Sequence, residues 1–116
     1  MNWKEYQQQT ERTFPDKGYE LNLLHCVIGT STEVAELLDQ AKKHIYYGKE
    51  LDVVNIEEEI GDACWYLSNL CRLLNLDFDQ ILQKNIDKLY ARFPDKFDAE
   101  KAINRDTEQE RKILEK

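Results

Sequence analysis

The sequence predicts an all-α fold, a bundle of four to five helices that is completed by oligomerisation. Apolar residues recur at intervals of three and four over long stretches, as they do along one face of an amphipathic helix. No stretch shows the sustained alternation of apolar and polar residues that marks a half-buried strand. Only four glycines and two prolines interrupt the 116 residues. A chain of this length often completes its core against a second copy.

The breaks in the apolar pattern divide the chain into helices. We expect a short helix over residues 2–13 and a long helix over residues 20–46, which Gly48 ends in a left-handed conformation. The clearest periodicity predicts a third helix over residues 52–74. A fourth helix is expected over residues 78–91, because a capping sequence precedes it and Phe-Pro follows it.

The end of the chain differs in composition from the rest. Asp77, followed by Gln80 three residues later, predicts the cap of the fourth helix. After residue 103 the sequence is nearly all polar. We therefore expect one helical domain over residues 1–103, and a polar tail or fraying helix over residues 104–116.

Charge and hydropathy exclude several classes of protein. The formal net charge is -7, which argues against binding to a nucleic-acid polymer, since such binders carry a basic face. The longest apolar stretches fall far short of the ~18–20 residues that span a bilayer. Three cysteines without a CxxC pair predict reduced thiols rather than a disulfide or zinc site. We expect a cytoplasmic protein that does not contact membranes.

Two pairs of acids stand out within the second and third helices. Glu33 and Glu36 are three residues apart, as are Glu59 and Asp62, so each pair shares one helical face. The connection between the pairs is long enough for the helices to run antiparallel with the pairs level. Gly61 lies inside the second pair, where a close approach of backbone or ligand would explain it.

A cation would relieve the repulsion between four such acids. Bringing the like charges together in a partly buried groove is costly without one. A set of oxygen ligands without His or Cys favours Mg2+, with Mn2+ as a second possibility. Neither histidine has Glu three residues before it, as a di-iron bundle requires. The alternative is that these acids are solvated charges on amphipathic helices.

The chain resembles the MazG-like family of all-α nucleoside triphosphate pyrophosphohydrolases over about residues 20–97. The resemblance rests on the two acidic pairs, on the segment around the second pair, and on a downstream segment. That segment contains Asn85, Lys88 and Arg92 at helical spacing. The family implies hydrolysis of an NTP or dNTP at the α-phosphorus, which yields the monophosphate and pyrophosphate. It also implies a homodimer or homotetramer.

The resemblance further implies roles for particular residues. The four acids would hold Mg2+, and Glu36 or Glu33 would take the proton of the attacking water. Asn85, Lys88 and Arg92 would contact phosphate; the alternative is that Lys88 and Arg92 form surface pairs with Asp87, Asp95 or Glu100. His25 and Trp65 could contact the nucleoside, although core packing or a dimer contact would explain them equally well.

Two other functions stay open at this point. One is a phosphoribosyl-ATP pyrophosphatase, an enzyme of the same superfamily whose acidic pattern differs in detail. The other is a helical interaction domain without catalytic activity. The sequence does not distinguish bases or sugars, because that choice depends on one or two hydrogen bonds in a pocket.

Overall fold

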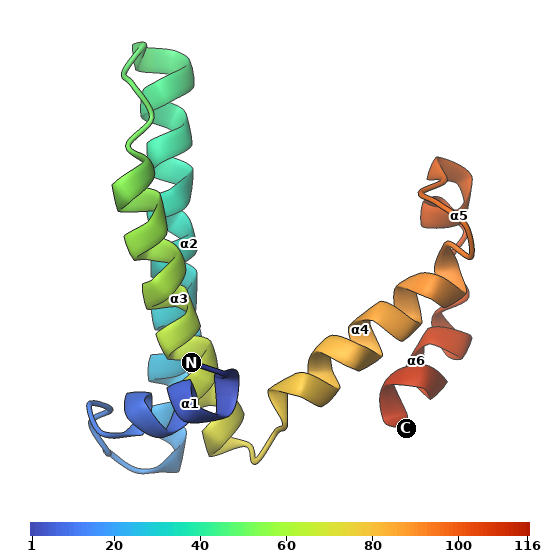
Figure 1. Cartoon of the computed structure of the whole chain (residues 1–116), viewed down its shortest axis with the longest axis horizontal. Helices are drawn as coiled ribbons and strands as arrows, with labels where there is room; N and C mark the ends of the chain where they lie inside the picture. Colours follow the sequence, from blue (N-terminus) through green and yellow to red (C-terminus); the bar gives the residue numbers. More distant parts are fainter. The chain divides into compact units, whose positions relative to one another are not determined.

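The structure is a computed structural model that describes residues 1–116, and it contains helices and no strand (Figure 1). The all-α prediction is therefore confirmed. The chain forms two compact units, Met1–Leu76 and Asp77–Lys116, which are described separately. The expected domain over residues 1–103 stays a prediction. The helices are α1 (Trp3–Glu11), α2 (Tyr19–Tyr47), α3 (Val53–Leu73), α4 (Phe78–Arg92), α5 (Ala99–Ile103) and α6 (Thr107–Glu115).

The first unit is built on a hairpin of two long helices. α2 and α3 run antiparallel and lie side by side along their length, and α1 packs against α3 (Figure 1). The observed ends of α2, α3 and α4 each lie within one residue of those expected from the apolar pattern. None of the helices has the length and apolar character needed to span a bilayer.

The ends of the hairpin helices follow from local backbone chemistry. Gly48 caps α2 in the left-handed region with a φ of 66°, as its position predicts. Asp52 begins α3 by accepting a hydrogen bond from a backbone N–H in its first turn. At the other end of α3, Asn75 takes a φ of 54°, and the Leu76 N–H donates to the Cys71 carbonyl at 2.8 Å. That bond is the outer bond of a Schellman motif.

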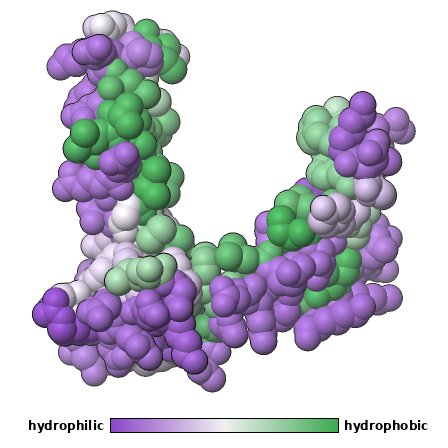
Figure 2. All heavy atoms as spheres, viewed as in Figure 1, coloured by the Kyte–Doolittle hydropathy of each residue, from purple (hydrophilic) through white to green (hydrophobic).

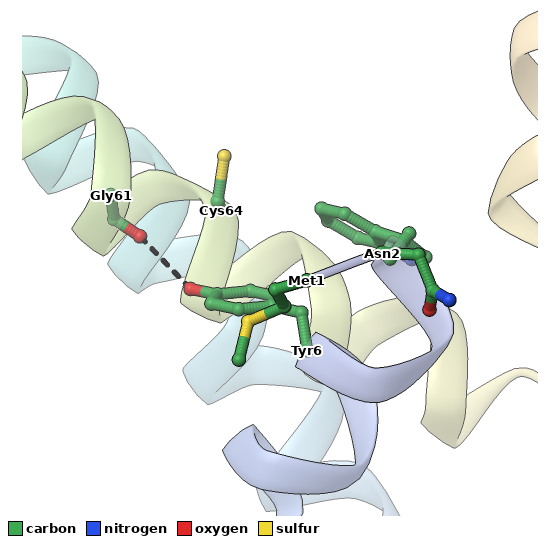
Figure 3. Close-up of a pocket in the computed structure, with 6 residues that line it drawn as sticks. Met1, Asn2, Tyr6, Gly61 and Cys64 are labelled. Carbon is green, nitrogen blue, oxygen red and sulfur yellow. Dashed lines mark hydrogen bonds between the residues drawn. The ribbon is translucent and has the colours of Figure 1, made fainter.

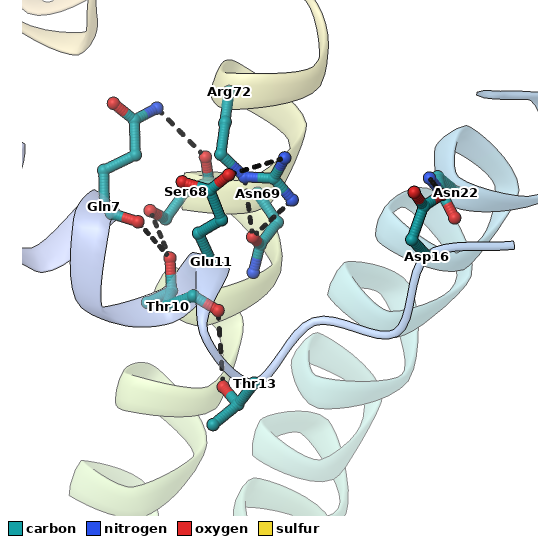
Figure 4. Close-up of polar contacts among 9 residues, drawn as sticks. All are labelled: Gln7, Thr10, Glu11, Thr13, Asp16, Asn22, Ser68, Asn69 and Arg72. Carbon is teal, nitrogen blue, oxygen red and sulfur yellow. Dashed lines mark hydrogen bonds and ion pairs between the residues drawn. The ribbon is translucent and has the colours of Figure 1, made fainter. Parts of the chain in front are cut away.

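Polar contacts hold α1 on α3 (Figure 4). The hydroxyls of Thr10 and Ser68 are 3.0 Å apart and both residues are buried. Asn69 of α3 is fully buried, and its Oδ1 accepts two hydrogen bonds from the guanidinium of Arg72, which lies 3.9 Å from the Glu11 carboxylate of α1. Because each of these buried polar groups has a partner, the contacts specify where α1 sits without a large apolar core.

Most large apolar side chains of the hairpin remain exposed. Only two apolar residues, Cys26 and Cys71, are buried in the single chain. Figure 2 shows hydrophobic residues running along the hairpin. The α2 residues at least half exposed include Leu38 at 71% and Ile45 at 69%. A hydrophobic surface of this extent exceeds what isolated soluble monomers usually show.

The second unit pairs α4 with α6. The polar segment at the end of the chain forms α6, and this helix packs against α4. Glu110 of α6 is only 4% exposed, and it bonds to Arg92 at 2.6 Å and to Arg105 at 2.8 Å. Two guanidinium groups therefore compensate the one buried carboxylate.

Candidate functional site

The acidic pairs meet where α2 faces α3. Ligand oxygens of Glu33, Glu59 and Asp62 all lie within 4.8 Å of one another. The structure thus brings together three of the four acids that the sequence singled out. Helical spacing explains this, because residues three apart share a face and the antiparallel hairpin sets the two faces opposite each other. Oxygen atoms this close could hold a divalent cation.

Glu59 is the most enclosed of these acids. It is 4% exposed, and its Oε2 is buried without a hydrogen-bond partner. Its Oε1 accepts a hydrogen bond from Asn55 at 3.3 Å. A buried carboxylate oxygen without a partner is costly, so the site fits a bound cation better than a solvated acidic surface.

The fourth acid, Glu36, lies exposed beside Glu59. The adjacent carboxyl of Glu59, close enough to share a proton with Glu36, is the first cause of the raised pKa of Glu36, and the negative charge of Glu59 adds to it. The pKa of Glu59 is also raised, first by the adjacent carboxyl of Glu33 and then by burial, although the Glu36 carboxyl lowers it. Both shifts have the direction expected of carboxyl groups held close together without a cation.

Aromatic side chains adjoin the acids. A pocket of about 340 Å³ is lined by Glu33, Asp62, Trp65 and Tyr66. The rings of Trp65 and Tyr66 meet edge to face with centroids 5.0 Å apart, and His25 lies 5.5 Å from Tyr66. One pocket wall thus carries negative charge and another carries flat apolar surface. This combination suits a ligand with a metal-bound anionic part and a ring.

Comparison with known proteins assigns the family. Residues 19–97, more than half of the chain, match the family model of the MazG nucleotide pyrophosphohydrolase domain. The chain belongs to this family. Membership supports a nucleotide pyrophosphohydrolase that acts on nucleotides and uses a divalent metal. A search of the curated proteins and a search of the solved structures gave no significant match.

The segment before α2 supports the aromatic wall of this MazG domain. Thr13 accepts a hydrogen bond from the indole N–H of Trp65 at 3.0 Å. Phe14 stacks on His25 with centroids 5.2 Å apart and lies 5.5 Å from Trp65. The sequence places this segment only between two expected helices. It also lies before the residues that match the family, so its role could not be found from that resemblance.

The two helical glycines near the acidic cluster of this MazG domain, Gly29 and Gly61, differ in how much space surrounds them. A Cβ on Gly61 would meet nothing within 4 Å, so the close approach of backbone that the sequence suggested at Gly61 does not occur within the single chain. Gly61 instead borders an open pocket of about 360 Å³ beside α1, where Tyr6 donates to its carbonyl at 3.3 Å (Figure 3). The close approach occurs at Gly29, where a Cβ would overlap the Tyr66 ring.

The predicted phosphate-binding residues of the MazG domain lie on α4, in the second unit. Asn85 is exposed and Lys88 is half-buried. Arg92 is bound to Glu110, a partner that the sequence reasoning did not consider, and its Nη2 is buried without a hydrogen-bond partner. The contact of these three residues with phosphate stays a prediction.

Proposed function

We propose that the protein hydrolyses a nucleoside triphosphate, either an NTP or a dNTP, to the monophosphate and pyrophosphate. The reaction would use Mg2+, with Mn2+ as a substitute, held by Glu33, Glu36, Glu59 and Asp62. The observation that carries the proposal is the gathering of carboxylate oxygens around the buried, unpartnered Oε2 of Glu59. Membership of the MazG family supports the reaction class.

The donor set suits a hard cation. All of the candidate ligands are carboxylate oxygens, which favours Mg2+ or Mn2+ over softer metals. When bound, such a cation neutralises phosphate charge and lowers the pKa of a water molecule. Without a cation, an acidic cluster would repel a triphosphate, which carries about four negative charges at neutral pH.

The first acidic pair supplies the base in this proposal. A water oxygen forms a bond to the α-phosphorus while the bond from that phosphorus to the bridging oxygen breaks. Glu36, or Glu33 in its place, accepts the proton of the water, and pyrophosphate leaves with the bonding electron pair. Glu36 suits this role because it is exposed to water.

Other residues of the chain would bind the substrate. His25 and Trp65 would contact the nucleoside, since Trp65 lines the pocket that Glu33 and Asp62 also line. The side chains of Asn85, Lys88 and Arg92 would donate hydrogen bonds to phosphate oxygens. The positive charges of Lys88 and Arg92 would also neutralise charge on the pyrophosphate leaving group.

A homodimer or homotetramer is part of the proposal. The exposed apolar residues of α2 and α3 support it, because a single chain buries so little of its own apolar surface. Light scattering of the purified protein over a range of concentrations should give two or four times the monomer mass of 13.8 kDa. A monomer at all concentrations would contradict this part of the proposal.

Pyrophosphate release from a panel of NTPs and dNTPs with Mg2+ tests the reaction. We expect release from at least one nucleotide, and Glu59→Gln should lower kcat by about 100-fold or more with an unchanged circular dichroism spectrum. Glu57→Gln is the matched control, since Glu57 is an exposed acid on the same helix. No release from any nucleotide, together with no rise in melting temperature on adding Mg2+, would refute the proposal.

A further inference from the structure

A relay of side-chain amides reaches the buried acid of the site from α2. Gln40 of α2 donates from Nε2 to the Oδ1 of Asn55 at 2.6 Å. Asn55, in the first turn of α3, donates from Nδ2 to the Oε1 of Glu59 at 3.3 Å. Asn55 and Gln40 are both half-buried. Neither belongs to the acidic pairs, so the relay is an addition to the set of residues around the site.

The carboxylate of Glu59, at the end of the relay, sets the direction of its hydrogen bonds. An ionised carboxylate can only accept hydrogen bonds, so Asn55 must present its NH2 group to Glu59. Its carbonyl oxygen then faces away from Glu59, toward Gln40. Gln40 must therefore present its own NH2 group. Asn55 thus has a single amide orientation that satisfies both Glu59 and Gln40, and Gln40 has a single orientation that satisfies Asn55.

The relay holds one oxygen of Glu59 and leaves the other without a partner. Oε1 accepts from Asn55, whereas Oε2 is buried and unpartnered. The backbone of Asn55 is itself fixed, because its N–H donates to the Asp52 side chain at 3.1 Å. The rotation of the Glu59 carboxylate is thus tied both to the start of α3 and, through Gln40, to the packing of α2 on α3.

We propose that Asn55 is a positioning residue that orients Glu59 for a divalent cation, and that Gln40 holds Asn55 in the required orientation. The inference rests on the proposed function only in requiring that a cation binds at Glu59. Partners that orient metal ligands typically contribute 10–100-fold to metal affinity. A contact that merely joins two helices would instead change stability and leave metal affinity as it was.

Mn2+ binding to the full chain tests this inference without nucleotide or turnover. Calorimetric titration should show that Asn55→Ala raises the dissociation constant of Mn2+ by about 10-fold or more. The backbone N–H that Asp52 caps is retained in this variant, so α3 should still form. With substrate present, the Mg2+ concentration for half-maximal rate should rise more than kcat falls.

A second substitution separates the relay from simple electrostatics. Gln40→Glu places an acceptor against the Asn55 carbonyl, so the Asn55 amide should rotate and present its oxygen to Glu59. The relay predicts weaker Mn2+ binding, in the same direction as Asn55→Ala. An added negative charge acting only through space would tighten Mn2+ binding.

Gln83→Ala is the matched control. Gln83 donates to Asp87, four residues later on α4, at 2.9 Å, which is the same kind of amide–carboxylate bond as that from Asn55 to Glu59. Its removal should leave the Mn2+ dissociation constant unchanged.

Two results would overturn the inference, and they are distinguishable. If the wild type binds Mn2+ and Asn55→Ala or Gln40→Glu binds it as tightly or more tightly, the relay has no positioning role and the proposed function stands. If the wild type binds no Mn2+ and releases no pyrophosphate, the proposed function fails and the inference fails with it.

Discussion

The indole N–H of Trp65 donates a hydrogen bond of 3.0 Å to the hydroxyl of Thr13. This bond joins the segment between α1 and α2 to the face of α3 that carries Asp62. Phe14 follows directly in the chain and packs against both Trp65 and His25. The segment therefore fixes the aromatic wall of the candidate nucleotide pocket from outside the family's matched region.

Loss of the Thr13 hydroxyl should weaken nucleotide binding. Thr13→Val keeps the shape of the side chain but removes the acceptor for Trp65. A net hydrogen-bond contribution of about 1 kcal/mol corresponds to a rise in KM of about five-fold, with kcat little changed. Steady-state kinetics with the preferred triphosphate measure both constants. Thr13→Ser retains the acceptor and should resemble the wild type, whereas a wild-type KM for Thr13→Val would show that the bond does not serve the pocket.

The two helical glycines should respond oppositely to alanine. Gly29→Ala forces a Cβ into the Tyr66 ring and should cost about 1–3 kcal/mol of unfolding free energy. Gly61→Ala places its Cβ in open space within α3 and should stabilise the protein by about 0.5–1 kcal/mol. Urea unfolding followed by circular dichroism measures both changes. Destabilisation by Gly61→Ala would reveal that something outside the single chain approaches this position.

Metal-free protein should become less stable as pH rises above the ordinary range of a glutamate. In the folded state the pKa of Glu36 is raised, first by the adjacent Glu59 carboxyl, and the pKa of Glu59 is raised, first by the adjacent Glu33 carboxyl. Their contribution to stability is complete below the unfolded pKa of about 4.3, and it is lost as pH rises through the raised folded values.

Glu36→Gln isolates that effect. The melting temperature of the variant minus that of the wild type, measured with a chelator present, should grow between about pH 5 and pH 8. Mg2+ should reduce the difference by stabilising the wild type. If the difference in melting temperature between variant and wild type did not change with pH, the acids would not repel one another in the folded state.

The contact between α4 and α6 should depend on Glu110. Its pKa is lowered, first by the hydrogen bond from Arg92 and also by Arg105. The stabilisation is therefore present above the unfolded pKa of about 4.3 and is lost as pH falls through the lowered folded value. At neutral pH, Glu110→Gln should lower the melting temperature and speed hydrogen exchange in α6, because Arg92 loses its charged partner.

Glu115→Gln provides the comparison for Glu110. Glu115 pairs with Arg111 on the same helix, but both side chains are exposed. Exposed pairs of this kind contribute little, so the melting temperature should hardly change. If Glu110→Gln and Glu115→Gln lowered the melting temperature equally, the burial of Glu110 would make no contribution to the stability that its ion pairs provide.

Local sequence features predicted the helices and their ends well. The bounds of α2, α3 and α4 followed from apolar spacing, and Gly48 took the left-handed conformation expected of it. These features depend on neighbours within a few residues, so they can be read along the chain. The short α5 was not foreseen, since five residues are too few to show a period.

The candidate site was predicted only in part, for a geometric reason. The acids were found because Glu33, Glu36, Glu59 and Asp62 repeat a spacing on two helices. The close approach of backbone expected at Gly61 occurs at Gly29 instead, because spacing cannot say which glycine faces another helix. The partner of Arg92 was missed because Glu110 lies 18 residues away in a segment without apolar periodicity.

By itself, the sequence determined the helical class, the helix ends and the identity of the four acids, because each depends on local spacing. Tertiary structure alone decided that Glu59 is the buried acid of the cluster. It also decided which distant residues form hydrogen bonds: Gln40 with Asn55, 15 residues apart in the sequence, and Thr13 with Trp65, 52 residues apart. Such contacts depend on the rotation and register of one helix against another. Those quantities are set by packing between distant segments, which no short stretch of sequence records.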